Sequence, residues 1–162
     1  MQKQDSGSSG SNPFFTEYET PFKVPPFDKI KAEHYVPAFE KGMEEHKKEI
    51  EAIANNEAEP TFENTIEAMV YSGKQLDKVS YVFYGLRSAN TSDALQEIAK
   101  EMSPKMSAHR DEIALNPELF KRIKSVYDNQ EQFDLDKEQA FLLENIYKSF
   151  VRNGANLSDT DK

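Results

Sequence analysis

The residues of this chain best suited to metal or acid–base chemistry are three histidines and a large set of carboxylates. The histidines are His34, His46 and His109. His46 and Glu49 are three residues apart, and such a pair on one helix can supply two ligands to a carboxylate-bridged metal site. The sequence has no second pair of this kind and no His-Glu-x-x-His zinc motif. We therefore interpret His46 and Glu49 as a hydrogen-bonded pair on a helix surface, and His109 as a partly buried core histidine with a polar partner.

The carboxylates are numerous enough to form pairs by chance, as in Glu44-Glu45 and in Asp134 with Asp136. General acid–base catalysis needs carboxylates whose pKa is shifted in a cleft, and nothing in the sequence places these residues in one. We expect these carboxylates to lie on solvated helix faces or to cap helices. The chain also has no cysteine, no nucleophile elbow and no glycine-rich phosphate loop. We therefore expect no catalytic, cofactor-binding or metal-binding residue in this sequence.

Three tyrosines, Tyr71, Tyr81 and Tyr84, are the remaining candidates for ligand contact. On a helix, Tyr81 and Tyr84 lie near one another and flank the apolar stripe, so they are placed to touch a ligand or a second partner. Aromatic side chains also fill wide gaps between helices. We favour packing against a neighbouring helix over ligand contact.

The elements that must position these residues are helices. Apolar residues recur at three- and four-residue steps through most of the chain, and no sustained alternating run predicts a strand. The pattern predicts an all-α fold with about five main helices in antiparallel packing. The predicted helices cover residues 35 to 55, 61 to 90, 93 to 113, 117 to 127 and 136 to 153.

Several residues predict where these helices begin, bend or end. Thr61 and Asp93 are predicted caps, Asn116 caps a helix with proline in its first position, and Asp136 forms a capping box with Gln139. Asn153-Gly154 ends the last helix. Gly73 is expected to bend the second helix rather than break it, and Pro104 to kink the third helix or divide it in two.

The chain divides into three parts by composition. Residues 1–11 are rich in Gln, Ser and Gly and predict a flexible polar tail. Residues 12–28 combine prolines with aromatic residues, which predicts an extended arm packed along the helical body. Residues 29–162 form the helical region.

The charge excludes one class of partner. The net charge is −9, and the basic residues are not segregated, so nucleic acid is not expected to bind. No apolar run approaches the roughly 20 residues that span a bilayer, and the N-terminus has no apolar signal core. Residues 1–11 are compatible with a native polar tail or with the remainder of a protein whose export signal was removed. Both the cytoplasm and the cell envelope or periplasm therefore stay open as locations.

Five blocks of sequence, in order along the chain, resemble the N-terminal region of the thimet oligopeptidase family of zinc metallopeptidases. They cover residues 26–43, 60–66, 88–91, 115–123 and 150–157. Each block alone is weakly specific, but five in the same order are highly specific. Within the family the resemblance is nearest to the bacterial peptidyl-dipeptidase branch, and next to the oligopeptidase A branch.

This resemblance implies a mostly helical parent enzyme divided by a deep channel that admits short peptides. Zinc and the catalytic residues would lie in a later part of that enzyme, since no residue of this chain matches them. The resemblance therefore implies a truncated, non-catalytic piece that forms a wall of the channel. Its partners would be the missing catalytic part and, through the parent, short peptides from whose C-terminus dipeptides are released.

Two alternatives remain at this point. One is internal cleavage by an oligopeptidase A-like endopeptidase. The other is a freestanding helical interaction module without enzymatic activity, which a reading frame that ends at Lys162 would favour and one that continues to a His-Glu-x-x-His would not. Because the apolar stripes are wide, we also expect the chain alone to expose an apolar surface or to self-associate.

Overall fold

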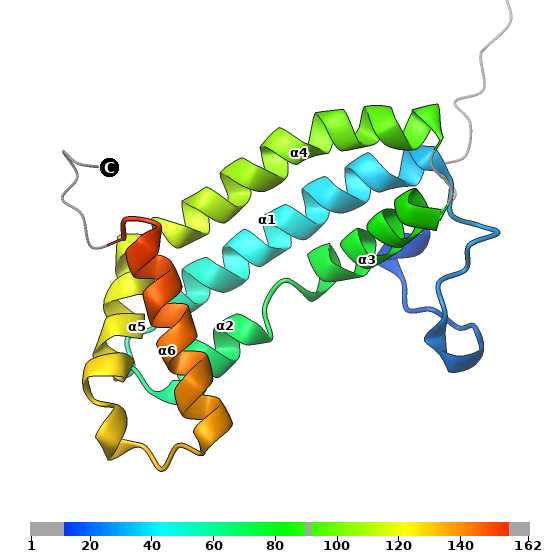
Figure 1. Cartoon of the computed structure of the whole chain (residues 1–162). Helices are drawn as coiled ribbons and strands as arrows, with labels where there is room; N and C mark the ends of the chain where they lie inside the picture. The colour runs from blue at the N-terminus through cyan, green and yellow to red at the C-terminus, as the bar shows by residue number, and fades with distance from the viewer. Residues whose placement is uncertain (1–11, 90–91, 156–162) are drawn as a thin grey trace, which may run out of the picture.

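The structure is a computed structural model that describes residues 12–89 and 92–155. These residues contain helices and no strand, which confirms the all-α prediction. The long helices are α1 (Tyr35–Ala54), α3 (Lys74–Ala89), α4 (Asp93–Ala114), α5 (Pro117–Asp128) and α6 (Lys137–Arg152). In Figure 1, α1 lies between α3 and α4, and α5 and α6 pack as a pair at one end of this layer. The predicted polar tail, residues 1–11, lies outside the described residues.

Four of the predicted helix ends are formed by the expected residues. The side chain of Thr61 accepts from the backbone N of Asn64, and the side chain of Asn116 accepts from the backbone N of Leu119. Asp136 and Gln139 form the predicted capping box. At the end of α6, Gly154 has φ 90°, a left-handed conformation that suits glycine. These ends were predictable because each cap bonds to a residue only a few positions away.

The second predicted helix is divided, so the expectation of a bend without a break at Gly73 is wrong. The segment begins with a π-helical turn, η4 (Phe62–Glu67), which leads into the short helix α2 (Ala68–Val70). Residues 71–73 are not helical, and α3 begins at Lys74. Gly73 has φ 74°, which a helix cannot contain. Its N–H donates to Glu49 Oε2 at 2.6 Å, so a carboxylate of α1 holds the break.

The third predicted helix, by contrast, is not divided. α4 is one helix of 22 residues with Pro104 inside it. Proline has no N–H to donate to the carbonyl four residues earlier, but α4 continues for ten residues beyond it. Its N-cap is Ser92, which accepts from the backbone N of Leu95, so the predicted cap Asp93 is instead the first helical residue. Two ion pairs join α4 to α1 beyond the proline, Lys105 with Glu40 at 2.7 Å and Glu112 with Lys47.

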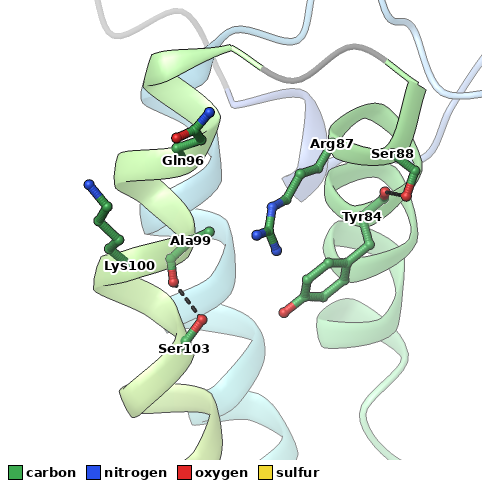
Figure 2. A pocket seen from close by; sticks show the side chains of 7 residues that line it. All are labelled: Tyr84, Arg87, Ser88, Gln96, Ala99, Lys100 and Ser103. Atoms are coloured by element: carbon green, nitrogen blue, oxygen red, sulfur yellow. Dashed lines mark hydrogen bonds between the residues drawn. The ribbon is translucent and has the colours of Figure 1, made fainter.

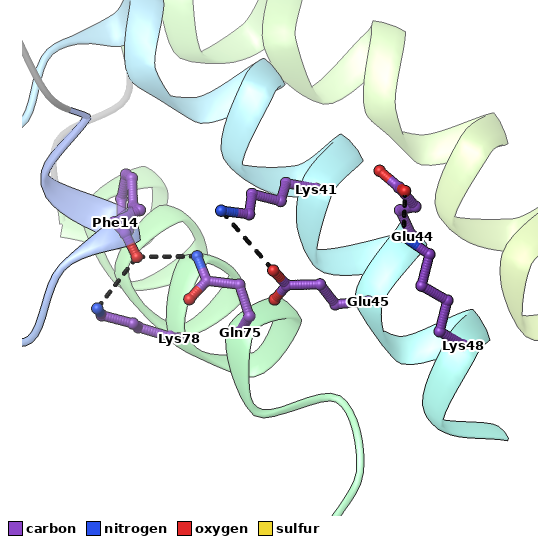
Figure 3. A network of polar contacts seen from close by, with 7 residues as sticks. All are labelled: Phe14, Lys41, Glu44, Glu45, Lys48, Gln75 and Lys78. Atoms are coloured by element: carbon purple, nitrogen blue, oxygen red, sulfur yellow. Dashed lines mark hydrogen bonds and ion pairs between the residues drawn. The ribbon is translucent and has the colours of Figure 1, made fainter. Parts of the chain in front are cut away.

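The N-terminal arm is joined to the helical body through Phe14. The arm contains two 3₁₀ turns, η1 (Pro13–Phe15) and η2 (Pro21–Lys23), and a third, η3 (Ala32–His34), precedes α1. The ring of Phe14 is fully buried against Tyr35, with 5.4 Å between ring centroids. Figure 3 shows Gln75 and Lys78 of α3 converging on the Phe14 carbonyl oxygen, at 2.9 and 3.1 Å. The predicted packing of the arm is confirmed for Phe14, whereas Phe22 is 99% exposed.

The core consists of two apolar clusters at opposite ends of α1. The first cluster joins the N-terminal half of α1 to α3, α4 and Phe14, with Phe39 and Phe83 packed edge to face at 5.3 Å. The second joins the C-terminal half of α1 to η4, α5 and α6, and is centred on Ile66, Ile123 and Leu143. Because α1 contributes to both clusters, it is the element that connects the two halves of the molecule. Within residues 12–89 and 92–155, no helix is long and apolar enough to cross a membrane.

Candidate functional site

The three histidines lie in two different places. His34 is the last residue of η3, and its Nδ1 accepts from the backbone N of Lys31 at 3.1 Å. His46 of α1 and His109 of α4 are in contact, with 3.1 Å between His46 Nδ1 and His109 Nε2 and with the rings edge to face. The structure therefore brings together two of the three candidate histidines and leaves His34 apart.

The contacts of His46 differ from those predicted. Its Nε2 lies 3.1 Å from Ser72 Oγ, at the break between α2 and α3. Glu49, its predicted partner, instead accepts from the N–H of Gly73. The predicted His46–Glu49 surface pair is thus wrong, because both side chains are used to hold residues of the break. The prediction for His109 is confirmed, since it is 7% exposed and its polar partner is His46.

Burial lowers the pKa of both histidines below the ordinary value of 6.5. For His46, Glu49 and Asp77 oppose this shift. For His109, the neighbouring His46 lowers the pKa further and Glu112 opposes the shift. Both rings are therefore neutral at pH 7.

Neutral imidazoles are possible metal ligands, but the surroundings of this pair do not complete a zinc site. In the part of the chain that the structure describes, no three His, Cys, Asp or Glu side chains are grouped so that they could hold a metal ion. A zinc site needs at least three protein ligands. The residues present do not fit the cofactor that the sequence resemblance implies for a parent enzyme.

The paired carboxylates are solvated, as predicted. Glu44 pairs with Lys48, and Glu45 pairs with Lys41 at 3.7 Å, both along the exposed face of α1 (Figure 3). Asp136 caps α6. None of these carboxylates lies in an enclosed cleft with a second acid, so they offer no acid–base pair.

A groove of about 550 Å³ lies between the C-terminal end of α3 and the N-terminal half of α4. Figure 2 shows the side chains of Tyr84 and Arg87 extending from α3 across the groove toward α4. The groove is lined by Tyr84, Arg87, Ser88, Gln96, Ala99, Lys100 and Ser103. The amide of Gln96 and the guanidinium of Arg87 line the groove with the phenol ring of Tyr84. Lys100 instead pairs with Glu97, and the hydroxyls of Ser88 and Ser103 donate to the carbonyl oxygens of Tyr84 and Ala99. Such a lining can donate hydrogen bonds to the carbonyl and carboxylate oxygens of a peptide and can pack against an apolar side chain.

Sequence reasoning identified only Tyr84 among the residues that line this groove. The others come from two helices whose facing sides are set by packing on α1, and their spacing along the chain carries no motif. Tyr84 is 44% exposed and packs edge to face on Phe83 at 5.3 Å. The predicted packing against a neighbouring helix is wrong for Tyr81, whose side chain is 79% exposed. Tyr71 is 62% exposed, and the ammonium group of Lys74 lies over its ring.

The chain is similar in sequence to two groups of bacterial peptidases. It is 40% identical over 151 residues to dipeptidyl carboxypeptidase of Escherichia coli, and 38% identical over 152 residues to dipeptidyl carboxypeptidase of Salmonella typhimurium. These alignments cover 93% and 94% of this chain. Oligopeptidase A of Escherichia coli is 26% identical over 138 residues, which is 85% of this chain.

The alignments cover only part of the relatives. The chain spans about 22% of the length of each dipeptidyl carboxypeptidase and 20% of oligopeptidase A. No protein-family model matches the chain. The order of the identities agrees with the order predicted from the sequence blocks. The chain belongs to the thimet oligopeptidase family, within which it is more similar to these dipeptidyl carboxypeptidases than to oligopeptidase A.

Proposed function

We propose that this chain forms part of the wall of the substrate channel in a longer peptidase that hydrolyses short peptides. The observation that carries the proposal is the similarity to dipeptidyl carboxypeptidase over 93% of the chain. The groove between α3 and α4 supports it, because an open groove with hydrogen-bond donors and an aromatic ring suits an extended peptide better than a compact ligand.

The reaction we propose for the complete peptidase is release of dipeptides from the C-terminus of the substrate. The relatives at 38–40% identity are named dipeptidyl carboxypeptidase, whereas those named oligopeptidase A are 24–26% identical. Zinc would be the cofactor, held by residues outside this chain, because the described residues do not provide a set of ligands. The chain alone would then bind zinc weakly and hydrolyse nothing.

Two measurements test the reaction. The purified 162-residue chain should contain no stoichiometric zinc and should not cleave N-blocked tetrapeptides, whereas the complete peptidase should release dipeptides that mass spectrometry identifies. Chelator-sensitive hydrolysis by the chain alone would overturn the proposal that it is a non-catalytic part. Amidation of the substrate's C-terminus should abolish dipeptide release, and continued cleavage inside an amidated peptide would indicate an endopeptidase.

A variant of the groove tests the channel role. Tyr84→Ala in the complete peptidase should raise KM for short peptides about fivefold, because an aromatic contact is worth about 1 kcal/mol. The value of kcat should change little, since this contact would bind ground state and transition state alike. Phe141→Ala is the matched control, because Phe141 is also an exposed aromatic residue but lies on α6. Equal KM values in the two variants would contradict a role of the groove in peptide binding.

A further inference from the structure

A polar layer separates the two apolar clusters of the core. It consists of His46 on α1, His109 on α4, and Ser72 and Gly73 at the break between α2 and α3, and we call it the histidine layer. A Cβ on Gly73 would lie 3.1 Å from the His46 ring, so the glycine backbone rests directly on the imidazole. α1, α4 and the break between α2 and α3 therefore each contribute residues to the layer.

The position of this layer follows from the residues on either side of it. On α1, Met43 belongs to the first cluster and Ile50 to the second. The other two segments show the same order. On α4, Met106 packs in the first cluster and Ile113 in the second, with His109 between them. At the break, Leu76 packs in the first cluster and Met69 in the second. The histidine layer is thus the place where the two halves of the molecule meet.

The hydrogen bonds of the layer run in one direction, which assigns the proton positions. Ser72 Oγ donates to the carbonyl oxygen of Met69 at 2.7 Å, so it must accept from His46 Nε2. His46 Nδ1 then carries no proton and accepts from His109 Nε2. Both rings are neutral in this arrangement. Nδ1 of His109 is left as the ring nitrogen that has no hydrogen-bond partner among the described residues.

We propose that the histidine layer is a pH-sensitive joint, which couples the two halves of the molecule while both imidazoles are neutral and loosens when they take up protons. A proton on His46 Nδ1 would set two N–H donors against each other at the site of the present hydrogen bond. A proton on His109 Nδ1 would keep that hydrogen bond but place a charge between two apolar clusters. The joint concerns only contacts within this chain, so it does not depend on the proposed channel role.

The charged groups around the layer decide which ring is protonated first. Glu49 from α1 and Asp77 from α3 act on His46, and Lys47 from α1 and Glu112 from α4 act on His109. Lys47 and Glu112 pair with each other, so their effects on His109 largely cancel. The first proton should nevertheless go to His109, because its Nδ1 is the only ring nitrogen of the pair that can accept a proton without breaking a hydrogen bond of the layer.

The pH window follows from the sign of the pKa shifts. Because burial lowers both pKa values in the folded chain, the unfolded chain binds protons first as the pH falls. The stabilisation is therefore complete above the unfolded value of 6.5 and is lost as the pH falls below it. Carboxylates titrate mainly near pH 4, so the interval from pH 6.5 to 5 reports on histidines.

Nuclear magnetic resonance of the histidine side chains in the intact chain tests the assignment. We expect proton on Nε2 of both His46 and His109 at pH 7.5, and titration of both below pH 6.5, with His109 first. Amide hydrogen exchange, corrected for its intrinsic pH dependence, should become faster around residues 71–76 between pH 7.5 and 5.5. Opposite tautomers, or unchanged exchange at the break over this interval, would overturn the proposal.

A stability comparison provides a second test with a matched control. In the native chain the unfolding equilibrium constant should rise by up to about tenfold for each pH unit that the pH is lowered, per histidine of the layer that titrates between pH 6.5 and 5. The variant His46→Gln/His109→Gln should lose this dependence, whereas His34→Gln, which changes the histidine outside the layer, should keep it. Equal pH dependence in the two variants would overturn the proposal, and the side-chain titration of the native chain decides the matter if the double variant does not fold.

Discussion

Arg122 is a buried cation whose partners are all uncharged. Its guanidinium donates to the carbonyl oxygens of Asn56 and Ala58 at 2.6 and 2.9 Å, and to Asn64 Oδ1 at 2.9 Å. It thereby ties α5 to the loop that follows α1 and to the start of η4. In the sequence, Arg122 looks like one member of a short basic turn with Lys121 and Lys124. Only the fold shows that it is 6% exposed and structural.

We predict that Arg122→Met lowers the free energy of unfolding by about 1–3 kcal/mol, because the carbonyl oxygens of Asn56 and Ala58 lose their side-chain donor, whereas Asn64 Oδ1 still accepts from the backbone N of Thr61. Lys121→Met is the control. Lys121 is exposed and has one ion pair at 3.9 Å with Glu118, so its replacement should change stability by no more than about 0.5 kcal/mol. Urea denaturation of the two variants measures the difference. A loss below about 1 kcal/mol for Arg122→Met would contradict a structural role for the guanidinium.

At the scale of elements, the contact between α1 and α3 depends on a glycine. A Cβ on Gly42 would lie 2.8 Å from the Cα of Leu76, closer than such atoms approach in proteins. The two helix backbones therefore meet at this point, and the neighbouring atom is backbone that cannot rotate away. Gly85, on the outer face of α3, has open space where its Cβ would be.

These two glycines should respond oppositely to the same substitution. Alanine favours a helix interior over glycine by roughly 1 kcal/mol, so propensity alone predicts that both variants are stabilised. We expect Gly85→Ala to be stabilised by about 0.5–1 kcal/mol. Gly42→Ala should instead be destabilised by about 1–3 kcal/mol, because α3 must move away from α1. Thermal or chemical unfolding measures both, and stabilisation of Gly42→Ala would show that the helices can separate at little cost.

At the scale of the whole molecule, the outer face of α3 exposes two neighbouring aromatic side chains. Tyr81 and Tyr84 border a shallow depression of about 560 Å³ that also includes Gly85. Tyr81 is 79% exposed, and apolar surface of this kind on an isolated chain favours association. The net charge of −9 opposes association through electrostatic repulsion.

We therefore expect the isolated chain to self-associate at high concentration, and more strongly in high salt, because salt screens the repulsion between the acidic molecules. Light scattering as a function of protein and salt concentration measures this. The variant Tyr81→Ser/Tyr84→Ser should remain monomeric under conditions in which Phe141→Ser, altered at an exposed aromatic residue of α6, still associates. A native chain that is monomeric at high concentration and binds no hydrophobic dye would contradict the prediction.

Sequence reasoning worked where the deciding contacts are local. The caps at Thr61, Asn116 and Asp136 each bond within three residues of themselves, so the side-chain types around them were enough to place these helix ends. It failed at Gly73, where the bond that stabilises the break comes from Glu49, 24 residues earlier. It also failed at the groove, whose lining comes from two separate helices.

The sequence by itself determined the helical composition, most helix ends and the family, because helix periodicity, capping and family-specific blocks are all written within short segments. The tertiary structure alone decided that His46 meets His109, which lies 63 residues away, and that Ser72 and Gly73 complete the layer between the two clusters. The physical reason is that such contacts depend on which faces of α1, α3 and α4 pack together. Those faces are chosen by burial of apolar side chains and by the close approach at Gly42, and no local pattern in the sequence specifies that choice.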